Sequence, residues 1–413
     1  MTSRERILAA IDHREPDKVP VDLGSHPSGG ISVVAYDNLV KYLGMDLKNY
    51  AYDVIQQVSQ PPMELIEHFG ADVLDLGRYF DDYPAYWHEL ELTPGHRALY
   101  PAWFNPEKLP DGSWEAQGPS GRVVGRMPEG ATFFDQVIFP YIDGYPGNYK
   151  NLGDDMALSV WGGLGMTPWD GNDGPGFWKR LRETAIRARG ETDKALMLGI
   201  GCNLFEWGCF LRRMDNFLMD LFLQPAEVER LLDALVERHM GNIQKTCDAV
   251  GDVVDIIKFG DDLGTNHGAL MPAETYQELF KPRHKAMCDY VKSHSDMKIM
   301  LHSCGSISLL MPDLIEAGFE ILNPVQINAR DMEPEFLKRE FGSDVTFWGG
   351  GVDTQSVLNK GSVQEVKEHV WRNLEIFSKG GGFVFNTVHN IMPDVPPENI
   401  VAAFDTVREF QNK

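Results

Sequence analysis

The chain has 413 residues, 43% of them hydrophobic, which is enough for a large buried core. Its formal net charge of −23 argues against nucleic acid and anionic membrane surfaces as partners. The five cysteines show no disulfide-like spacing, and there is no apolar signal core or run near the ~20 residues of a membrane helix, so we expect a cytoplasmic protein.

The predicted elements alternate between short apolar strands and amphipathic helices. A capping box formed by Thr2 and Glu5 begins a first helix. Strands are expected near residues 19–24, 71–77, 195–201, 253–260, 298–304, 321–325, 345–350 and 382–387. Helices are expected near 36–43, 61–69, 178–190, 205–224, 225–250, 272–293, 307–317, 334–341, 362–378 and from 397 onward. Eight strands alternating with helices are typical of an α/β fold, the (β/α)8 TIM barrel.

Residues from about 79 to 153 interrupt this alternation. They are rich in proline, glycine and aromatic residues, and short β-like pieces such as 89–92 and 121–126 alternate with turns. We interpret them as an insertion of loops and hairpins after the second strand, whose aromatic side chains mostly pack on the main body. The whole chain, residues 1–413, is then expected to be a single barrel domain.

The strand expected at 298–304 changes abruptly from apolar to polar residues, as a buried parallel strand does where it leaves a sheet. Residues i and i+2 of a strand point to the same face, so His302 and Cys304 project together. An imidazole and a thiol are preferred ligands of a borderline-soft metal such as zinc. A hydrogen-bonded core histidine beside an inert thiol is the commoner explanation of a bare His-x-Cys pattern.

A third metal ligand is expected from another strand end, because a barrel brings the loops after its strands to one mouth. His389, which follows the eighth predicted strand, is the first candidate. Three protein ligands with an open fourth position form the pattern of a catalytic zinc site. The rival third ligands are Glu206, Cys202 and Asp353.

Other strand ends supply candidates for catalysis and substrate binding. Glu206, Asp261 and Asp262 follow the third and fourth predicted strands, where they could position substrate or relay protons. The two aspartates are also suited to supporting a ligand histidine, or simply to capping their loop. The candidate substrate-binding residues are His26, Asn203, Asn323, Gln326 and Asp353. Loop capping is the simpler role for Asn323 and Asp353 taken singly.

The chain resembles the uroporphyrinogen decarboxylase superfamily over nearly its whole length outside the insertion. The stretches that carry this resemblance are 5–11, 16–21, 216–225, 260–264, 281–282, 302–305, 323–326 and 348–353. The resemblance implies a (β/α)8 barrel, in agreement with the strand count.

Arginines distinguish the true decarboxylases of this superfamily, which hold an acidic tetrapyrrole with an Arg-Gln-Ala-Gly-Arg-like stretch after the first strand. Here the same place reads Asp22-Leu-Gly-Ser-His-Pro-Ser, and there is no arginine between Arg14 and Arg78. An octacarboxylate substrate needs several guanidinium groups, so porphyrinogen decarboxylation and binding of large polyanions are not expected.

The corrinoid-linked methyltransferases are another branch of the superfamily, and the chain resembles them at the metal positions. Those enzymes carry His-x-Cys on the fifth strand, matched by His302 and Cys304, and a cysteine before a proline-rich turn after the eighth strand, where His389 stands here. A His/Cys/His set has one thiolate fewer, which implies a more electrophilic metal, suited to an ether or another methyl donor. Related demethylases of methoxylated aromatic compounds belong to the superfamily, and the aromatic-rich insertion fits such a substrate.

The resemblance thus implies a zinc-dependent methyltransferase, with Glu206, Asp261 and Asp262 in catalytic roles. The chain shows no recognisable corrinoid-binding domain, so the corrinoid (cobalamin) is expected on a separate partner protein. A metal-free, decarboxylase-like lyase acting on a smaller acid is the second interpretation. A barrel that only binds a tetrapyrrole or corrinoid is the third. The methyl donor and acceptor, the direction of transfer and the oligomeric state stay open.

Overall fold

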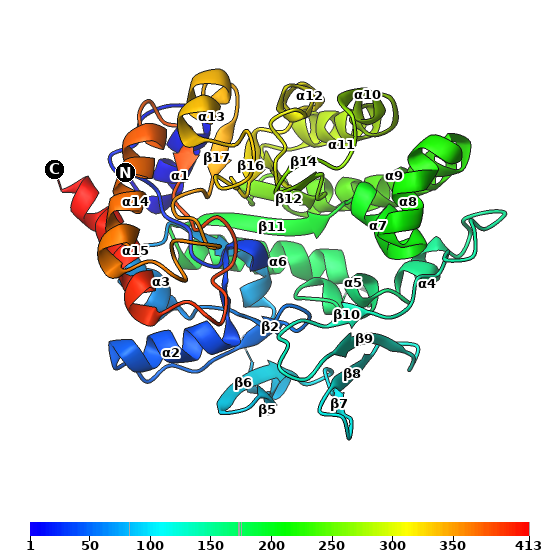
Figure 1. Cartoon of the computed structure of the whole chain (residues 1–413), viewed down its shortest axis with the longest axis horizontal. Helices are drawn as coiled ribbons and strands as arrows, with labels where there is room; N and C mark the ends of the chain where they lie inside the picture. The colour runs from blue at the N-terminus through cyan, green and yellow to red at the C-terminus, as the bar shows by residue number, and fades with distance from the viewer. Residues whose placement is uncertain (82, 172–173, 175, 413) are drawn as a thin grey trace.

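The computed structural model describes residues 1–81, 83–171, 174 and 176–412. Seven parallel strands form one curved sheet, with helices around it (Figure 1). In sheet order the strands are β18 (Phe383–Val384), β17 (Thr346–Trp348), β16 (Ile321–Asn323), β15 (Lys298–His302), β12 (Ile256–Gly260), β11 (Ala195–Gly201) and β4 (Val73–Asp75). These seven strands lie where the sequence predicts them.

The segment around Val21 joins the two edges of this sheet. Val21 forms a parallel bridge with Phe385, next to β18, and the backbone N–H of Phe385 donates to the carbonyl of Pro20 at 2.8 Å. On the other side, the N–H of Asp72, next to β4, donates to the carbonyl of Val21 at 2.7 Å. The predicted (β/α)8 barrel is confirmed, but its first strand is reduced from 19–24 to a single bridging residue.

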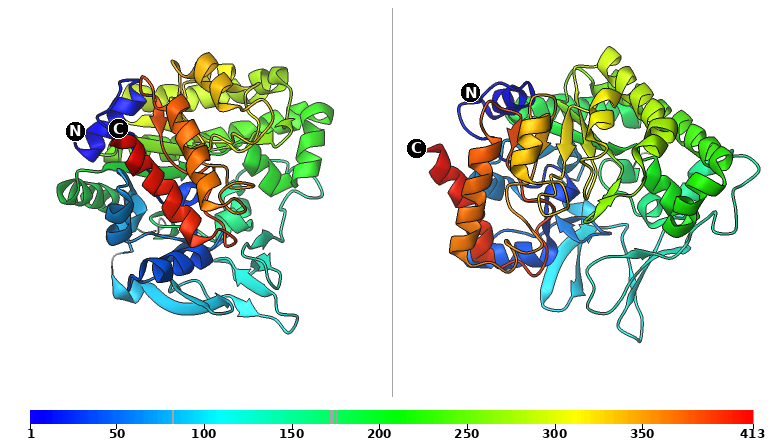
Figure 2. Two further views of the ribbon diagram at one scale, coloured as in Figure 1. Left: turned by 60° about the vertical axis from the view of Figure 1, so that its left-hand side comes forward. Right: turned by 45° about the horizontal axis from the view of Figure 1, so that its top comes forward.

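Helices connect the strands and cover the outside of the barrel (Figure 2). The main helices are α1 (Ser3–Ile11), α2 (Val33–Leu43), α3 (Met63–Phe69), α6 (Phe177–Glu191), α7 (Phe205–Arg212), α8 (Met214–Leu223), α9 (Pro225–Val250), α11 (Lys281–His294), α12 (Met311–Ala317), α13 (Pro334–Phe341), α14 (Val363–Phe377) and α15 (Pro397–Gln411). Three shorter ones are α4 (Leu152–Met156), α5 (Val160–Gly163) and α10 (Ala273–Thr275). No helix in the described part of the chain is both long and apolar enough to cross a bilayer.

Strand alternation divides the core into two layers. Outward-facing residues such as Ile257 and Leu301 pack against the helices in a large cluster. Inward-facing residues fill the barrel together with one face of α1, and the members of this lumen cluster are Ile7, Ala10, Ile11, Val73, Ala195, Met197, Ile256, Met300, Ile321, Trp348 and Val384. These packed apolar side chains fill the barrel toward the N-terminal ends of its strands and form what we call the apolar floor.

The inserted region consists of antiparallel pieces. β5 (Trp87–Thr93) and β6 (His96–Pro101) form a hairpin. A four-stranded sheet follows, in the order β10 (Asp135–Gln136), β9 (Val123–Met127), β8 (Trp114–Gln117) and β7 (Glu107–Lys108). Tyr100, Phe104 and Phe134 are buried here in a cluster that also contains Ala51 and Val54. These aromatic side chains pack in the protein, as the sequence predicts for most of them.

A small sheet formed by residues on both sides of α2 in the chain has no counterpart among the predicted elements. It contains β1 (Ile31–Ser32), β3 (Val58–Ser59) and β2 (Ala51–Asp53) in that order. Two or three residues are too few to show the alternation that identifies a strand. A two-residue antiparallel pair, β13 (Gly264–Thr265) with β14 (Gly268–Ala269), follows the fourth barrel strand and was missed for the same reason.

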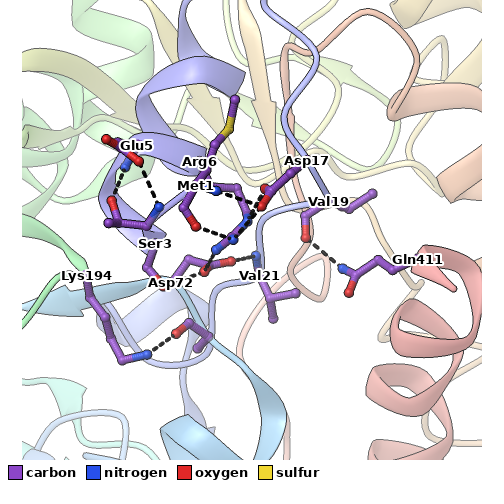
Figure 3. Close-up of polar contacts among 12 residues, drawn as sticks. Met1, Ser3, Glu5, Arg6, Asp17, Val19, Val21, Asp72, Lys194 and Gln411 are labelled. Atoms are coloured by element: carbon purple, nitrogen blue, oxygen red, sulfur yellow. Dashed lines mark hydrogen bonds and ion pairs between the residues drawn. The ribbon is translucent and has the colours of Figure 1, made fainter.

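A buried ionic network fixes the closing segment to the barrel (Figure 3). One Asp72 carboxylate oxygen accepts hydrogen bonds from the Arg6 guanidinium at 2.6 Å and from the Ser3 hydroxyl at 2.7 Å. The other accepts the backbone N–H of Val21 at 3.0 Å. Asp17 also pairs with Arg6, at 2.7 Å. Asp72 therefore ties α1, the Val21 segment and β4 together.

Replacing Asp72 by alanine should lower the free energy of unfolding by about 3 kcal/mol, because it removes one of the two carboxylate partners of the buried Arg6 and leaves the N–H of Val21 unpaired. Denaturant unfolding measures this loss. The control is Asp289→Ala, which breaks an exposed ion pair with Lys285 and should leave stability near that of the wild type. Equal stability of the two variants would contradict the role assigned to Asp72.

Candidate metal centre

The inner face of the barrel changes from apolar to polar toward the C-terminal ends of its strands. On β15, Met300 belongs to the lumen cluster, and the next residue on the same face is His302. On β12 the same alternation leads from Ile256 to Lys258. On β16, Asn323 pairs in register with His302. The strand ends therefore place a layer of polar side chains above the apolar floor.

Asn323 holds His302 in one tautomer. The amide nitrogen of Asn323 donates to the carbonyl of Trp348 at 2.9 Å, which directs the amide oxygen to His302 Nδ1 at 2.8 Å. An amide oxygen only accepts, so Nδ1 carries the proton and Nε2 keeps a lone pair. That Nε2 lies 3.4 Å from Sγ of Cys304. Histidine ligands of metal ions are oriented in this way by a partner on the other ring nitrogen.

His389 reaches the same point from the loop after β18. Its Nδ1 lies 2.7 Å from the amide oxygen of Asn390, which again leaves Nε2 as the free ring nitrogen. The ligand atoms of His302, Cys304 and His389 all lie within 4.8 Å of one another, and no other such group of histidine, cysteine and acidic residues occurs in the described part of the chain. The two imidazole rings are 5.6 Å apart between centroids.

Burial sets the protonation of these three side chains. It lowers the pKa of His302 to about 3, with a further lowering by Lys258, and it also lowers the pKa of His389. Both imidazoles are therefore neutral, the form that binds metal. Burial, followed by the charge of Asp262, raises the pKa of the Cys304 thiol, and a bound cation would oppose that effect by displacing the proton. Two oriented imidazoles and one thiol fit zinc.

The rival third ligands are directed elsewhere. Cys202 is buried, with Sγ 3.8 Å from the carbonyl of Ile200. The Asp353 carboxylate accepts the backbone N–H of Gln355 at 2.8 Å within the turn after β17. Glu206 accepts a hydrogen bond from the Asn203 amide at 2.5 Å. Of the four candidates, only His389 lies with His302 and Cys304.

The two adjacent aspartates have different surroundings. Asp261 is fully buried and caps α7, where its carboxylate accepts the backbone N–H groups of Phe205 at 3.0 Å and Glu206 at 2.9 Å. Asp262 accepts the backbone N–H of Cys304 at 2.8 Å, and the same oxygen lies 3.7 Å from His302 Nε2. Asp261 therefore positions Glu206, while Asp262 lies at the metal centre.

Two predicted substrate-binding residues border this centre. His26 is buried with its ring centroid 6.4 Å from that of His302, and neither of its ring nitrogens has a hydrogen-bond partner. Gln326 accepts the backbone N–H of Gly305 at 2.8 Å and so orders the turn that follows Cys304. His26 makes no hydrogen bond, although its Nε2 lies 3.7 Å from a carboxylate oxygen of the buried Asp22, whereas the oxygen of Gln326 is occupied by the turn.

Sequence reasoning missed two polar residues near this centre. Lys258 was hidden inside a predicted strand, although its alternation with Ile256 places it on the inner face. Tyr52 lies on β2, in the small sheet that the sequence did not reveal. Asp75 and Arg78 lie at the end of the second predicted strand, but their residue types alone indicate no role.

The fold is a (β/α)8 barrel, and the candidate metal ligands lie at the C-terminal ends of its strands, where barrels of this kind have their active sites. Residues 205–410 match the model of the uroporphyrinogen decarboxylase (URO-D) family, in agreement with the resemblance seen in the sequence.

Individual relatives cover only part of the chain. A uroporphyrinogen decarboxylase of Rickettsia felis is 25% identical over 159 residues, 38% of this chain and 42% of the relative. One from Pseudomonas fluorescens is 26% identical over 195 residues, 46% of this chain and 50% of the relative. The chain thus spans half or less of the length of these two relatives. A solved structure described as a methyltransferase from Methanosarcina mazei covers 99% of both chains at 16% identity with a TM-score of 0.60, which shows a shared fold.

Replacing Asn323 by alanine should weaken zinc binding about 10- to 100-fold, because it frees the His302 ring from the partner that orients it. Competition with a chromophoric chelator measures the affinity. Asn359→Ala, which removes an exposed contact with Asp394, is the matched control and should bind zinc as the wild type does. Unchanged affinity in Asn323→Ala would show that this amide does not orient a metal ligand.

Proposed function

We propose that this protein is a zinc-dependent methyltransferase that moves a methyl group between a small substrate and a corrinoid carried by a separate protein. The convergence of His302, Cys304 and His389 carries this proposal. Each imidazole has its Nδ1 committed to an asparagine oxygen and its Nε2 free, which a merely structural pair of histidines does not require. The whole-length likeness in fold to a methyltransferase supports the same conclusion.

The chain's own residues would prepare the reaction as follows. His302, Cys304 and His389 would hold the metal, and Asn323 and Asn390 would keep the two rings in place. When bound, zinc supplies a Lewis acid that polarises the heteroatom bearing or accepting the methyl group.

Glu206 is suited to hold the proton that the reaction needs. Burial, followed by the charges of Asp262 and Asp261, raises the pKa of Glu206 well above its ordinary value, so the carboxyl keeps its proton at neutral pH. Asn203 and the capped N-terminus of α7 fix its position. In the demethylation of an ether, the methyl group would leave its oxygen for the corrinoid of the partner protein, and the freed oxygen would take the proton of Glu206.

The first test is metal retention. Purified protein incubated with zinc and desalted should retain about one zinc per chain, because two oriented imidazoles and a thiolate bind it together. Cys304→Ala should retain none while keeping a folded barrel, as circular dichroism would show. Cys247→Ala, at a cysteine outside the metal group, is the control and should retain zinc. Absence of zinc from the wild type would refute the metal proposal.

The second test separates the transferase from its alternatives. Methyl transfer from a methoxylated aromatic compound should require an added corrinoid protein, because the cobalt that takes part is not supplied by this chain. Mass spectrometry of the demethylated product measures the reaction with and without that protein. Full methyl transfer by this chain alone would contradict the need for a partner. Decarboxylation of uroporphyrinogen would support a lyase instead, as the names of the curated relatives suggest.

A further inference from the structure

Lys258 is a cationic side chain on the inner face of the barrel without a direct partner. It pairs in register with Gly199 on β11 and with Met300 on β15, and Gly199 contributes no side chain beside it. Among the described residues it makes no hydrogen bond and no ion pair within 4.0 Å. Burial lowers the pKa of Lys258, while Glu206, Asp262, Cys304 and Asp75 lie near enough to oppose that lowering. It therefore lies in the polar layer that also contains the metal centre.

Two further donors near the end of β4 are buried and unsatisfied. The Tyr52 hydroxyl has no hydrogen-bond partner, and the side chain is only 2% exposed. Nη1 of Arg78 has none either, although Nη2 of the same guanidinium is anchored on the carbonyl of Pro61 at 3.0 Å. Leaving buried donors unpaired costs about 1–3 kcal/mol each, so native proteins rarely do so without a ligand or water to accept the bond.

Asp75 connects the three donors in space. Its charge acts on Tyr52, Arg78 and Lys258. The register of β4, β11 and β12 sets Asp75 level with Ile256, and Lys258 is the next residue on the same face of β12. One of its oxygens accepts the backbone N–H of Gly77 at 3.0 Å, and among the described contacts it makes no ion pair with Arg78 or Lys258. Burial raises the pKa of Asp75 to about 7, and Asp81 is a second buried carboxyl whose charge acts on Arg78. The Tyr52 hydroxyl and Nη1 of Arg78 nevertheless have no hydrogen-bond partner, so both can donate to an oxygen of a ligand.

We propose that Lys258, Arg78 and Tyr52 bind a carboxylate group of the substrate. Two cations and one hydroxyl offer donors of the kind that a single carboxylate accepts. The metal centre lies on the β15 and β18 side of the mouth, and Arg78 and Tyr52 lie on the β4 side, so a flat molecule held between them presents its far end to the metal centre. A monocarboxylic aromatic acid with a methoxy group has this form. The choice of a methoxy group as the reacting group rests on the proposed function, whereas the carboxylate site does not.

Binding of simple aromatic acids tests the site. Benzoate and 4-methoxybenzoate, titrated into zinc-loaded protein by calorimetry, should bind at least tenfold more tightly than uncharged methoxybenzene. Lys258→Met should weaken benzoate binding about 10- to 100-fold, the loss expected for one charge-assisted hydrogen bond. Tyr52→Phe should weaken it roughly threefold to tenfold, since it removes a neutral donor. Lys285→Met, on the outer surface of α11, is the matched control and should bind benzoate as the wild type does.

The same measurements show what would overturn the proposal. Equal affinity for benzoate and methoxybenzene, or unchanged benzoate binding in Lys258→Met, would show that no carboxylate is recognised there. Tighter binding of phenyl phosphate than of benzoate would replace the carboxylate by a phosphate group. Circular dichroism of each variant shows whether a loss of binding reflects a loss of fold, and Lys258→Arg, which keeps the charge, should then restore affinity.

A metal-free variant separates this inference from the proposed function. Cys304→Ala should still bind benzoate in a manner that depends on Lys258, because none of the three carboxylate donors is a metal ligand. Loss of benzoate binding in Cys304→Ala, with its fold intact, would show that the acid binds the metal instead. If the wild type retains no zinc but binds benzoate through Lys258, the metal proposal fails and the carboxylate site stands. If it retains zinc but does not discriminate benzoate, the carboxylate site fails alone.

Discussion

Closure of the barrel at Val21 is the constraint on which the rest of the structure depends. Val21 alone takes the place of the first strand: it forms a bridge with Phe385, which is hydrogen-bonded to the flanking Pro20 and Asp22, and its own carbonyl accepts the N–H of Asp72 next to β4. So short a strand cannot hold itself in place, and the buried Asp72 carboxylate supports it by accepting its N–H. Because the sheet closes, the loop after β18 returns to the mouth, and His389 meets a cysteine 85 positions earlier in the chain.

The polar layer above the apolar floor contains two kinds of residue. Asn323, Asn390 and Asp261 have their acceptors committed to ring nitrogens or backbone N–H groups, so they fix the positions of other side chains. His26, Tyr52 and Arg78 have buried polar atoms with no hydrogen-bond partner in the described protein. Buried polar groups need hydrogen bonds, so a layer in which the second kind of residue stays unpaired is suited to bind a ligand that supplies the missing partners. This contrast, more than the presence of polar residues alone, identifies the mouth as a functional site.

The strands and helices of the barrel were predictable because their signals are local. Alternation in the strand ending at His302 directs that residue and Cys304 to one side, and eight apolar runs separated by helices indicate the closed fold. What could not be predicted depends on tertiary contacts. Nothing local shows that Asp261 caps α7, or that Tyr52, from a three-residue strand, lies beside Asp75. Lys258 could have been found, but a lysine inside an apolar run is easily assigned to an exposed end rather than to the lumen.

The net charge of −23 and the cations at the mouth are compatible because they act over different ranges. Salt screens the surface carboxylates within about 8–10 Å, whereas a cation inside the barrel acts through a medium of lower dielectric constant. The overall charge therefore discourages a large polyanion, which would extend beyond the mouth and meet the acidic surface. A substrate with one carboxylate, enclosed by the barrel, would meet the donors of Lys258 and Arg78 directly. The absence of arginines after the first strand and the presence of two cations further along the rim thus favour the same kind of substrate, a small acid with a single anionic group.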